Sequence, residues 1–210
     1  MNHLAHFLLA PAEPQAVVGT LLADFHRGAI DASLPDAVAR AVRLHRAIDS
    51  ATDGHVEVLA LKAAFAPGRR RFAGLALDLY FDHCLTRDWP RYADVALDAF
   101  VAATYAALDA ELDAPFVPPR MRGFATAMRE HDWLRSYATL DGVAAGLGRL
   151  EHTFRRRFAR DVDLRPLLDE LVRLQPECDG AFAAVFPRLQ RSVAGEDADR
   201  QPDPNPARRA

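Results

Sequence analysis

The sequence predicts an all-α fold built as a single domain. Apolar residues recur at helical spacing in one segment after another up to about residue 190, and no segment alternates convincingly between apolar and polar residues. Half of the 210 residues are hydrophobic, which is enough to bury a substantial core. No internal repeat or linker interrupts residues 1–190, so we expect one helical domain over 1–192.

The helices are expected in the following order. The first covers 17–28 and ends at Gly28, a residue type favoured just after a helix. The second covers 35–50 and opens with a proline in its first turn. The third covers 70–87, is apolar nearly all round, and is therefore expected to be central. Further helices are expected over 89–112, 124–134, 142–154 and 164–190, with Pro176 and Pro187 breaking or kinking the last.

Composition limits the setting and the partners. The formal charge of −3 favours neither nucleic acid nor an anionic membrane as a general partner. The separated Cys84 and Cys178 form no disulfide or CxxC framework, so we expect a reducing, cytoplasmic setting. No apolar run approaches the roughly 20 residues that span a bilayer, and the first residues do not resemble a signal peptide. Residues 193–210 are rich in charge and proline, so we expect a disordered tail there.

Carboxylates lie on the inward faces of three predicted helices. Asp24 lies on the same face as the apolar residues of the first helix. His45 and Asp49 are four residues apart on the second. Asp78 and Asp82 are four apart in "ALDLYFDHCL" (76–85), which is otherwise almost entirely apolar. Buried carboxylates close together repel one another and lose hydration, so a bound cation would stabilise them.

Oxygen-rich ligands with imidazoles and no set of thiolates favour Mn²⁺ or Mg²⁺, with Fe²⁺ or Zn²⁺ as alternatives. Each group also has a structural explanation, since an inward aspartate is often a cap or an ion-pair partner. Asp53 is better explained as the N-cap of the next helix, and His83 could be a core histidine. His3 and His6 could be solvated, and nearby arginines could neutralise the acids. The joint occurrence on three helices favours the metal site.

Other catalytic motifs are missing from the sequence. It contains no G-x-x-x-x-G-K-[ST] phosphate loop, no G-x-G-x-x-G dinucleotide loop after a strand and no G-x-S-x-G nucleophile elbow. Nucleotide binding of those types and serine-hydrolase chemistry are therefore not expected.

Four segments together resemble the acyl carrier protein phosphodiesterases, a divergent branch of the HD-type metal phosphohydrolases. They are "MNHLAH" (1–6), "GTLLADFHRG" (19–28), "LHRAIDSATDGH" (44–55) and "LDLYFDHCLTRDW" (77–89). The sequence departs from the family pattern at His3, Thr20 and His26, and the Asp82-His83 order reverses the usual His-Asp doublet. The resemblance implies an HD-like helical bundle. It also implies removal of the 4′-phosphopantetheine arm from holo-acyl carrier protein, typically with Mn²⁺.

The expected roles combine the resemblance with the residue pattern. They are metal ligands Asp24, His45, Asp78 and Asp82; proton-transfer groups His83 and Asp49; and phosphate or substrate contacts Arg27, Arg46, His6 and Asn2. An acidic carrier protein is expected to dock on Arg69, Arg70 and Arg71, or on 155–157. Two alternatives remain open at this point: an HD-like phosphohydrolase of a small nucleotide or other phosphodiester, and a non-enzymatic helical protein that binds the carrier protein.

Overall fold

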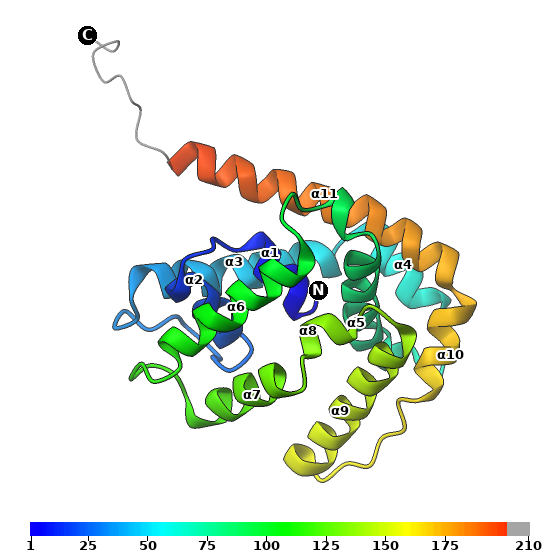
Figure 1. The fold of residues 1–210 in the computed structure, drawn as a ribbon. Coiled ribbons are helices and arrows are strands. Elements are labelled where there is room, and N and C mark those ends of the chain that lie inside the picture. Colours follow the sequence, from blue (N-terminus) through cyan, green and yellow to red (C-terminus); the bar gives the residue numbers. More distant parts are fainter. Residues whose placement is uncertain (201–210) are drawn as a thin grey trace.

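The computed structural model describes residues 1–200, which form helices and connecting loops with no β-strand among them (Figure 1). The prediction of an all-α fold is confirmed. The α-helices are α1 (His3–Leu9), α2 (Pro14–Leu22), α3 (Asp36–Asp53), α4 (Val56–Ala64), α5 (Ala73–Arg87), α6 (Leu97–Glu111), α7 (Pro119–Glu130), α8 (Trp133–Ser136), α9 (Leu140–Phe158), α10 (Pro166–Arg173) and α11 (Gln175–Arg200). Two 3₁₀ turns, Arg70–Phe72 and Trp89–Arg91, flank α5.

Helix α5 is the centre of the molecule, as its all-round apolar sequence predicts. Eleven of its fifteen residues are buried, and it packs against α1, α9, α10 and α11. The buried apolar residues from Met1 to Leu189 form one continuous core. No helix in residues 1–200 is long and apolar enough to cross a membrane.

Several helix ends differ from the prediction. Helix α2 ends at Leu22 and the chain turns, so Asp24 lies in a turn; Gly28 lies farther on, at a φ of +88°. The segment 89–112 is divided between a 3₁₀ turn and α6, because residues 93–96 form a connecting loop. The last predicted helix breaks at Leu174, but Pro187 lies inside α11 without ending it. Residues 193–200 continue α11 beyond the predicted start of the tail, and 201–210 lie outside the described residues.

Close contact between α2 and α3 places the polar residues of both helices around one cavity. A Cβ atom added at Gly19 would lie 2.7 Å from the Val38 carbonyl oxygen and 2.9 Å from Ala41 Cβ. Only glycine allows this approach, because both neighbouring groups belong to the packed face of α3. The turn that carries Asp24 follows α2 directly and is therefore held beside His45.

We expect the substitution Gly19→Ala to lower the free energy of unfolding by about 1–3 kcal/mol, because the added methyl group overlaps the α3 backbone. Urea denaturation followed by circular dichroism measures this change. Gly123→Ala in α7 is the matched control, since no atom lies within 4 Å of its added Cβ. It should leave stability unchanged or raise it by up to about 1 kcal/mol. Equal stabilities of the two variants would contradict the close-packing explanation.

Candidate functional site

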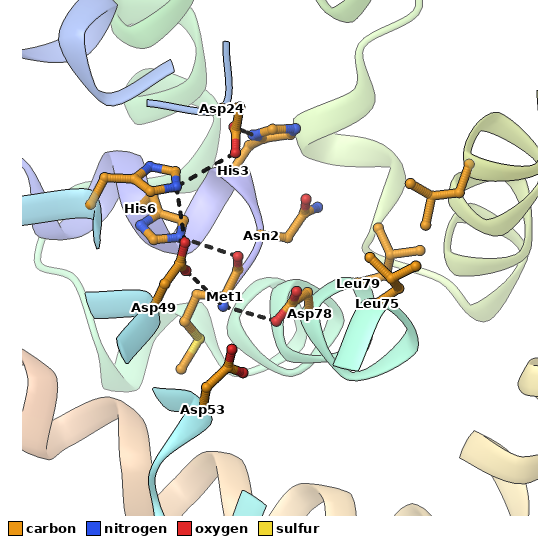
Figure 2. Close-up of a pocket in the computed structure, with 12 residues that line it drawn as sticks. Met1, Asn2, His3, His6, Asp24, Asp49, Asp53, Leu75, Asp78 and Leu79 are labelled. Carbon is orange, nitrogen blue, oxygen red and sulfur yellow. Dashed lines mark hydrogen bonds and ion pairs between the residues drawn. The ribbon is translucent and has the colours of Figure 1, made fainter. Parts of the chain in front are cut away.

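A cavity of about 260 Å³ lies where α1, α3 and α5 meet the turn after α2. Figure 2 shows the imidazole and carboxylate groups on one side of this cavity and the side chains of Leu75 and Leu79 on the other. The polar lining residues are Asn2, His3, His6, Asp24, His45, Asp49, Asp53 and Asp78. We call this space the polar cavity.

Two histidines and one aspartate form the densest part of the polar cavity. The rings of His6 and His45 stack with centroids 3.7 Å apart and planes 4° from parallel. Asp49 contacts both rings, with Oδ1 2.9 Å from His6 Nε2 and Oδ2 3.3 Å from His45 Nε2. The predicted pairing of His45 with Asp49 across one turn of helix is therefore present, and α1 adds His6 to it.

The turn after α2 brings a second carboxylate to the same place. Asp24 Oδ1 lies 3.6 Å from His45 Nε2, and Asp24 Oδ2 lies 3.5 Å from His3 Nδ1. Figure 2 shows Asp24 above His6 and Asp49 below it. Three separate segments of the chain thus converge on one group of nitrogen and oxygen atoms.

This set of side chains fits a divalent metal ion. One ligand atom from each of His6, His45 and Asp49 can be chosen so that all lie within 4.8 Å of one another. The Nδ1 atoms of both histidines are buried and have no hydrogen-bond partner among the described residues. Imidazole nitrogens and carboxylate oxygens are ligands that Mn²⁺, Fe²⁺ and Zn²⁺ accept. The arrangement can hold such an ion; it does not distinguish among these metals.

Burial and the mutual contacts set the charges in the polar cavity. Burial lowers the pKa of His6 to about 4 and that of His3 to about 3, so both rings are neutral near pH 7. Burial raises the pKa of Asp24. For Asp49 burial acts in the same direction, but hydrogen bonds with His45 and His6 outweigh it, and the pKa falls below its usual range. Asp49 is therefore a carboxylate beside the neutral imidazole of His6, and metal binding requires both groups in these forms.

The two aspartates of "ALDLYFDHCL" separate in the structure. Asp78 lines the polar cavity, is about one-third exposed, and accepts a hydrogen bond of 2.9 Å from the amino group of Met1. Asp82 is fully buried outside the cavity lining and accepts hydrogen bonds from the amides of Leu4 and Ala5, at 2.9 and 3.1 Å. Burial raises the pKa of Asp82 to about 7, although both amide bonds favour its carboxylate form. Asp82 thus holds the first turn of α1, which carries His6.

His83 also lies away from the polar cavity. It is buried, and its Nδ1 atom lies 2.8 Å from the carbonyl oxygen of Tyr137, which links α5 to the end of α8. The structure brings together Asp24, His45, Asp49 and Asp78 from the expected ligand and proton-transfer groups, along with His6 and Asn2. It does not bring Asp82 or His83 to them.

The expected arginine contacts lie elsewhere. Arg46 donates to the carbonyl oxygens of His26 and Gly28, both at 2.9 Å, and so holds the loop after α2. Arg27 is exposed and lies outside the lining of the polar cavity. Arg69 pairs with Glu170 at 3.1 Å, and Arg70 donates to the Phe65 carbonyl oxygen at 2.9 Å.

The remaining basic residues and Asp53 have local contacts as well. Arg71 stacks on Phe72, with 4.6 Å between its guanidinium carbon and the ring centroid. Asp53 pairs with Lys62 at 2.7 Å, and the N-cap of α4 is His55, whose side chain accepts from the Glu57 amide. The interpretation of Asp53 as that N-cap was wrong, because α3 extends to Asp53 and α4 begins only at Val56.

Sequence reasoning missed two residues beside the polar cavity. A solvated His3 is one alternative that the sequence allows, but in the structure His3 contacts Asp24 and packs edge-on against Phe124, with ring centroids 5.3 Å apart. Arg149 belongs to none of the sequence motifs, and it lines an adjoining cleft. The helical repeat of α1, with His6 three residues after His3, is the available indication for His3. Nothing local indicates Arg149, since it comes to line one cleft with Asn2 and His3 only in the folded chain.

Comparison with known proteins gives consistent results over nearly the whole chain. Residues 1–189 match the family model described as acyl carrier protein phosphodiesterase. Proteins of that name from Salmonella dublin and from Klebsiella pneumoniae strain 342 are 37% and 31% identical to it. These alignments cover 92% and 91% of this chain and 98% and 96% of the relatives. One from Escherichia coli O157:H7 is 32% identical, over 90% of this chain and 92% of the relative. The search of solved structures gave no significant match.

Proposed function

The chain belongs to the acyl carrier protein phosphodiesterase family, and from that premise we propose that it hydrolyses holo-acyl carrier protein at its phosphodiester. The bond cut joins the 4′-phosphopantetheine arm to a serine, so the products are apo-acyl carrier protein and 4′-phosphopantetheine. The family makes the chain a phosphodiester hydrolase, which removes the non-enzymatic alternative. The observation that carries the proposal is the convergence of His6, His45 and Asp49 within 4.8 Å.

We assign the metal-holding role to His6, His45, Asp49 and Asp24, with Mn²⁺ as the expected ion. This revises the expected ligand set: His6 and Asp49 enter it, Asp49 having been expected as a proton-transfer group, and Asp78 and Asp82 leave it. A divalent ion at such a site supplies Lewis-acid polarisation of the phosphoryl group and activation of water. Asp82 and His83 are then positioning residues, because Asp82 fixes the backbone before His6 and His83 fixes Tyr137.

Residues outside this donor set take the remaining tasks. Asn2 has a buried Nδ2 atom without a hydrogen-bond partner among the described residues, so its amide can donate to a phosphate oxygen. His3 and Asp78 line the same cavity and are placed to take a proton from the attacking water or to return one to the serine leaving group. Leu75, Leu79 and Leu150 line the polar cavity and exclude water from part of it.

The test is incubation of the purified protein with holo-acyl carrier protein and Mn²⁺, followed by mass spectrometry of the carrier protein. We expect loss of the phosphopantetheine mass with Mn²⁺ and no loss with excess EDTA. Nucleotide phosphodiesters, assayed in parallel, test the alternative of a small-nucleotide phosphohydrolase. Hydrolysis of a nucleotide with an unchanged carrier protein would overturn the proposal.

A further inference from the structure

A second, larger cleft of about 740 Å³ adjoins the polar cavity and shares Asn2, His3, Leu79 and Leu150 with it. Its walls come from α7, α8 and α9, which lie together in Figure 1 on the side of the molecule away from α4 and α11. We call it the aromatic cleft, because Phe124, Trp133 and Tyr137 line it. A phosphodiester in the polar cavity would have this cleft directly beside it.

Aromatic side chains and one arginine form a continuous wall in the aromatic cleft. Phe124 packs edge-on against Trp133, with ring centroids 5.1 Å apart. The Arg149 guanidinium lies 4.6 Å from the Trp133 ring centroid and donates to the Tyr137 hydroxyl at 3.1 Å. Besides Arg149 and the shared Asn2 and His3, the polar side chains of the lining are His131, Ser136, His152 and Thr153, and most of the cleft surface is apolar. Such a lining suits an uncharged chain that has apolar groups and a few hydrogen-bonding atoms.

Close packing fixes the positions of the helices that line the aromatic cleft. A Cβ at Gly142 would overlap the Ser136 carbonyl oxygen, so α9 contacts the end of α8 at the backbone. A Cβ at Gly146 would lie 3.1 Å from Leu79 and 3.3 Å from Tyr137. At Gly146, α9 therefore packs closely against the side chains of Leu79 and Tyr137. In contrast, a Cβ at Gly148 would meet no atom within 4 Å, although Gly148 lines the cleft.

We propose that the aromatic cleft binds the pantetheine part of the substrate, with Asn2 and His3 at its junction with the phosphate. This inference rests on the proposed function. The substrate has a folded protein on one side of the phosphodiester and a flexible, uncharged arm on the other. The arm has a dimethyl group, two amides and a terminal thiol, which match aromatic walls with sparse polar groups. A cleft of this volume can enclose the arm, whereas the carrier protein can only lie at the mouth.

The test fills the aromatic cleft without touching the polar cavity, by the substitution Gly148→Leu. Gly180→Leu in α11 is the matched control, because Gly180 is also exposed, also helical and has no atom within 4 Å of its added Cβ. Calorimetry measures binding of Mn²⁺ and of free pantetheine to each protein. Mass spectrometry gives kcat/KM for holo-acyl carrier protein, and bis(4-nitrophenyl) phosphate serves as a small diester without the arm.

We expect Gly148→Leu to lower kcat/KM for holo-acyl carrier protein by about 10- to 200-fold and to abolish pantetheine binding. Mn²⁺ binding and activity on the small diester should match the wild type, and Gly180→Leu should match it in every assay. Ala145→Leu, also in the cleft lining, should repeat the first result if Gly148→Leu fails to fold. Unchanged pantetheine binding and unchanged kcat/KM in folded cleft variants would overturn the inference while the proposed function stands. A wild type that cleaves no holo-acyl carrier protein would instead overturn the function, and failure of pantetheine to bind it would overturn the cleft assignment.

Discussion

Replacing Asp49 by asparagine is expected to lower kcat/KM for holo-acyl carrier protein by on the order of 10³-fold, equivalent to roughly 4 kcal/mol of transition-state stabilisation. Asp49 is the carboxylate that contacts both stacked histidines, so its loss removes the negative charge shared by His6 and His45. Calorimetric titration with Mn²⁺ should show weaker binding, and the far-ultraviolet circular dichroism should match the wild type. The hydrolysis assay and the titration together separate loss of the metal from loss of the fold.

Asp53→Asn is the matched control for Asp49→Asn. Asp53 lines the same polar cavity one turn farther along α3, but its carboxylate pairs with Lys62. We expect its kcat/KM to stay within a few-fold of the wild type, because an exposed ion pair contributes little. Wild-type Mn²⁺ affinity in Asp49→Asn would contradict the assignment of Asp49 as a ligand.

Replacing Asp82 by alanine is expected to destabilise the protein by about 3 kcal/mol, because the buried amides of Leu4 and Ala5 both lose their hydrogen-bond acceptor. For a chain of this length the melting temperature should fall by roughly 6–12 °C, measured by thermal unfolding. Activity should fall as well, since the turn held by Asp82 carries His6. Asp82→Ala therefore differs from a ligand substitution, which removes activity with little change in stability.

Asp78→Ala provides the comparison on the same helix. Asp78 lies one turn before Asp82 but is partly exposed in the polar cavity, so its removal should change the melting temperature by less than half as much. Equal stability of Asp82→Ala and the wild type, with activity lost, would favour a direct catalytic role for Asp82. That result would contradict the positioning role proposed above.

The family, the helical class and much of the polar set could be predicted from the sequence. Helical periodicity follows from local spacing, and it correctly placed His45 and Asp49 on one face because residues four apart on a helix are neighbours. The same spacing marked Asp78 and Asp82 as inward. In both cases the physical cause lies within a few residues of the chain, where the sequence is directly informative.

Only the tertiary structure decided which inward groups share a cavity. The side-chain directions of Asp78 and Asp82 differ by about 40° around the axis of α5. As a result Asp78 lines the polar cavity, whereas Asp82 accepts hydrogen bonds from backbone amides of α1. His83 contacts the carbonyl oxygen of Tyr137, which is 54 residues away in the sequence. The histidines that α1 contributes to the polar cavity are His3 and His6. The aromatic cleft depends likewise on α9 meeting α8 at Gly142. Local spacing in the sequence was enough to place His45 and Asp49 on one face of α3 and Asp78 and Asp82 on α5. Packing between helices that are distant in sequence determines which of these side chains share a cavity. The reason is that burial and backbone hydrogen bonding depend on long-range contacts, which cannot be read from the spacing of neighbouring residues.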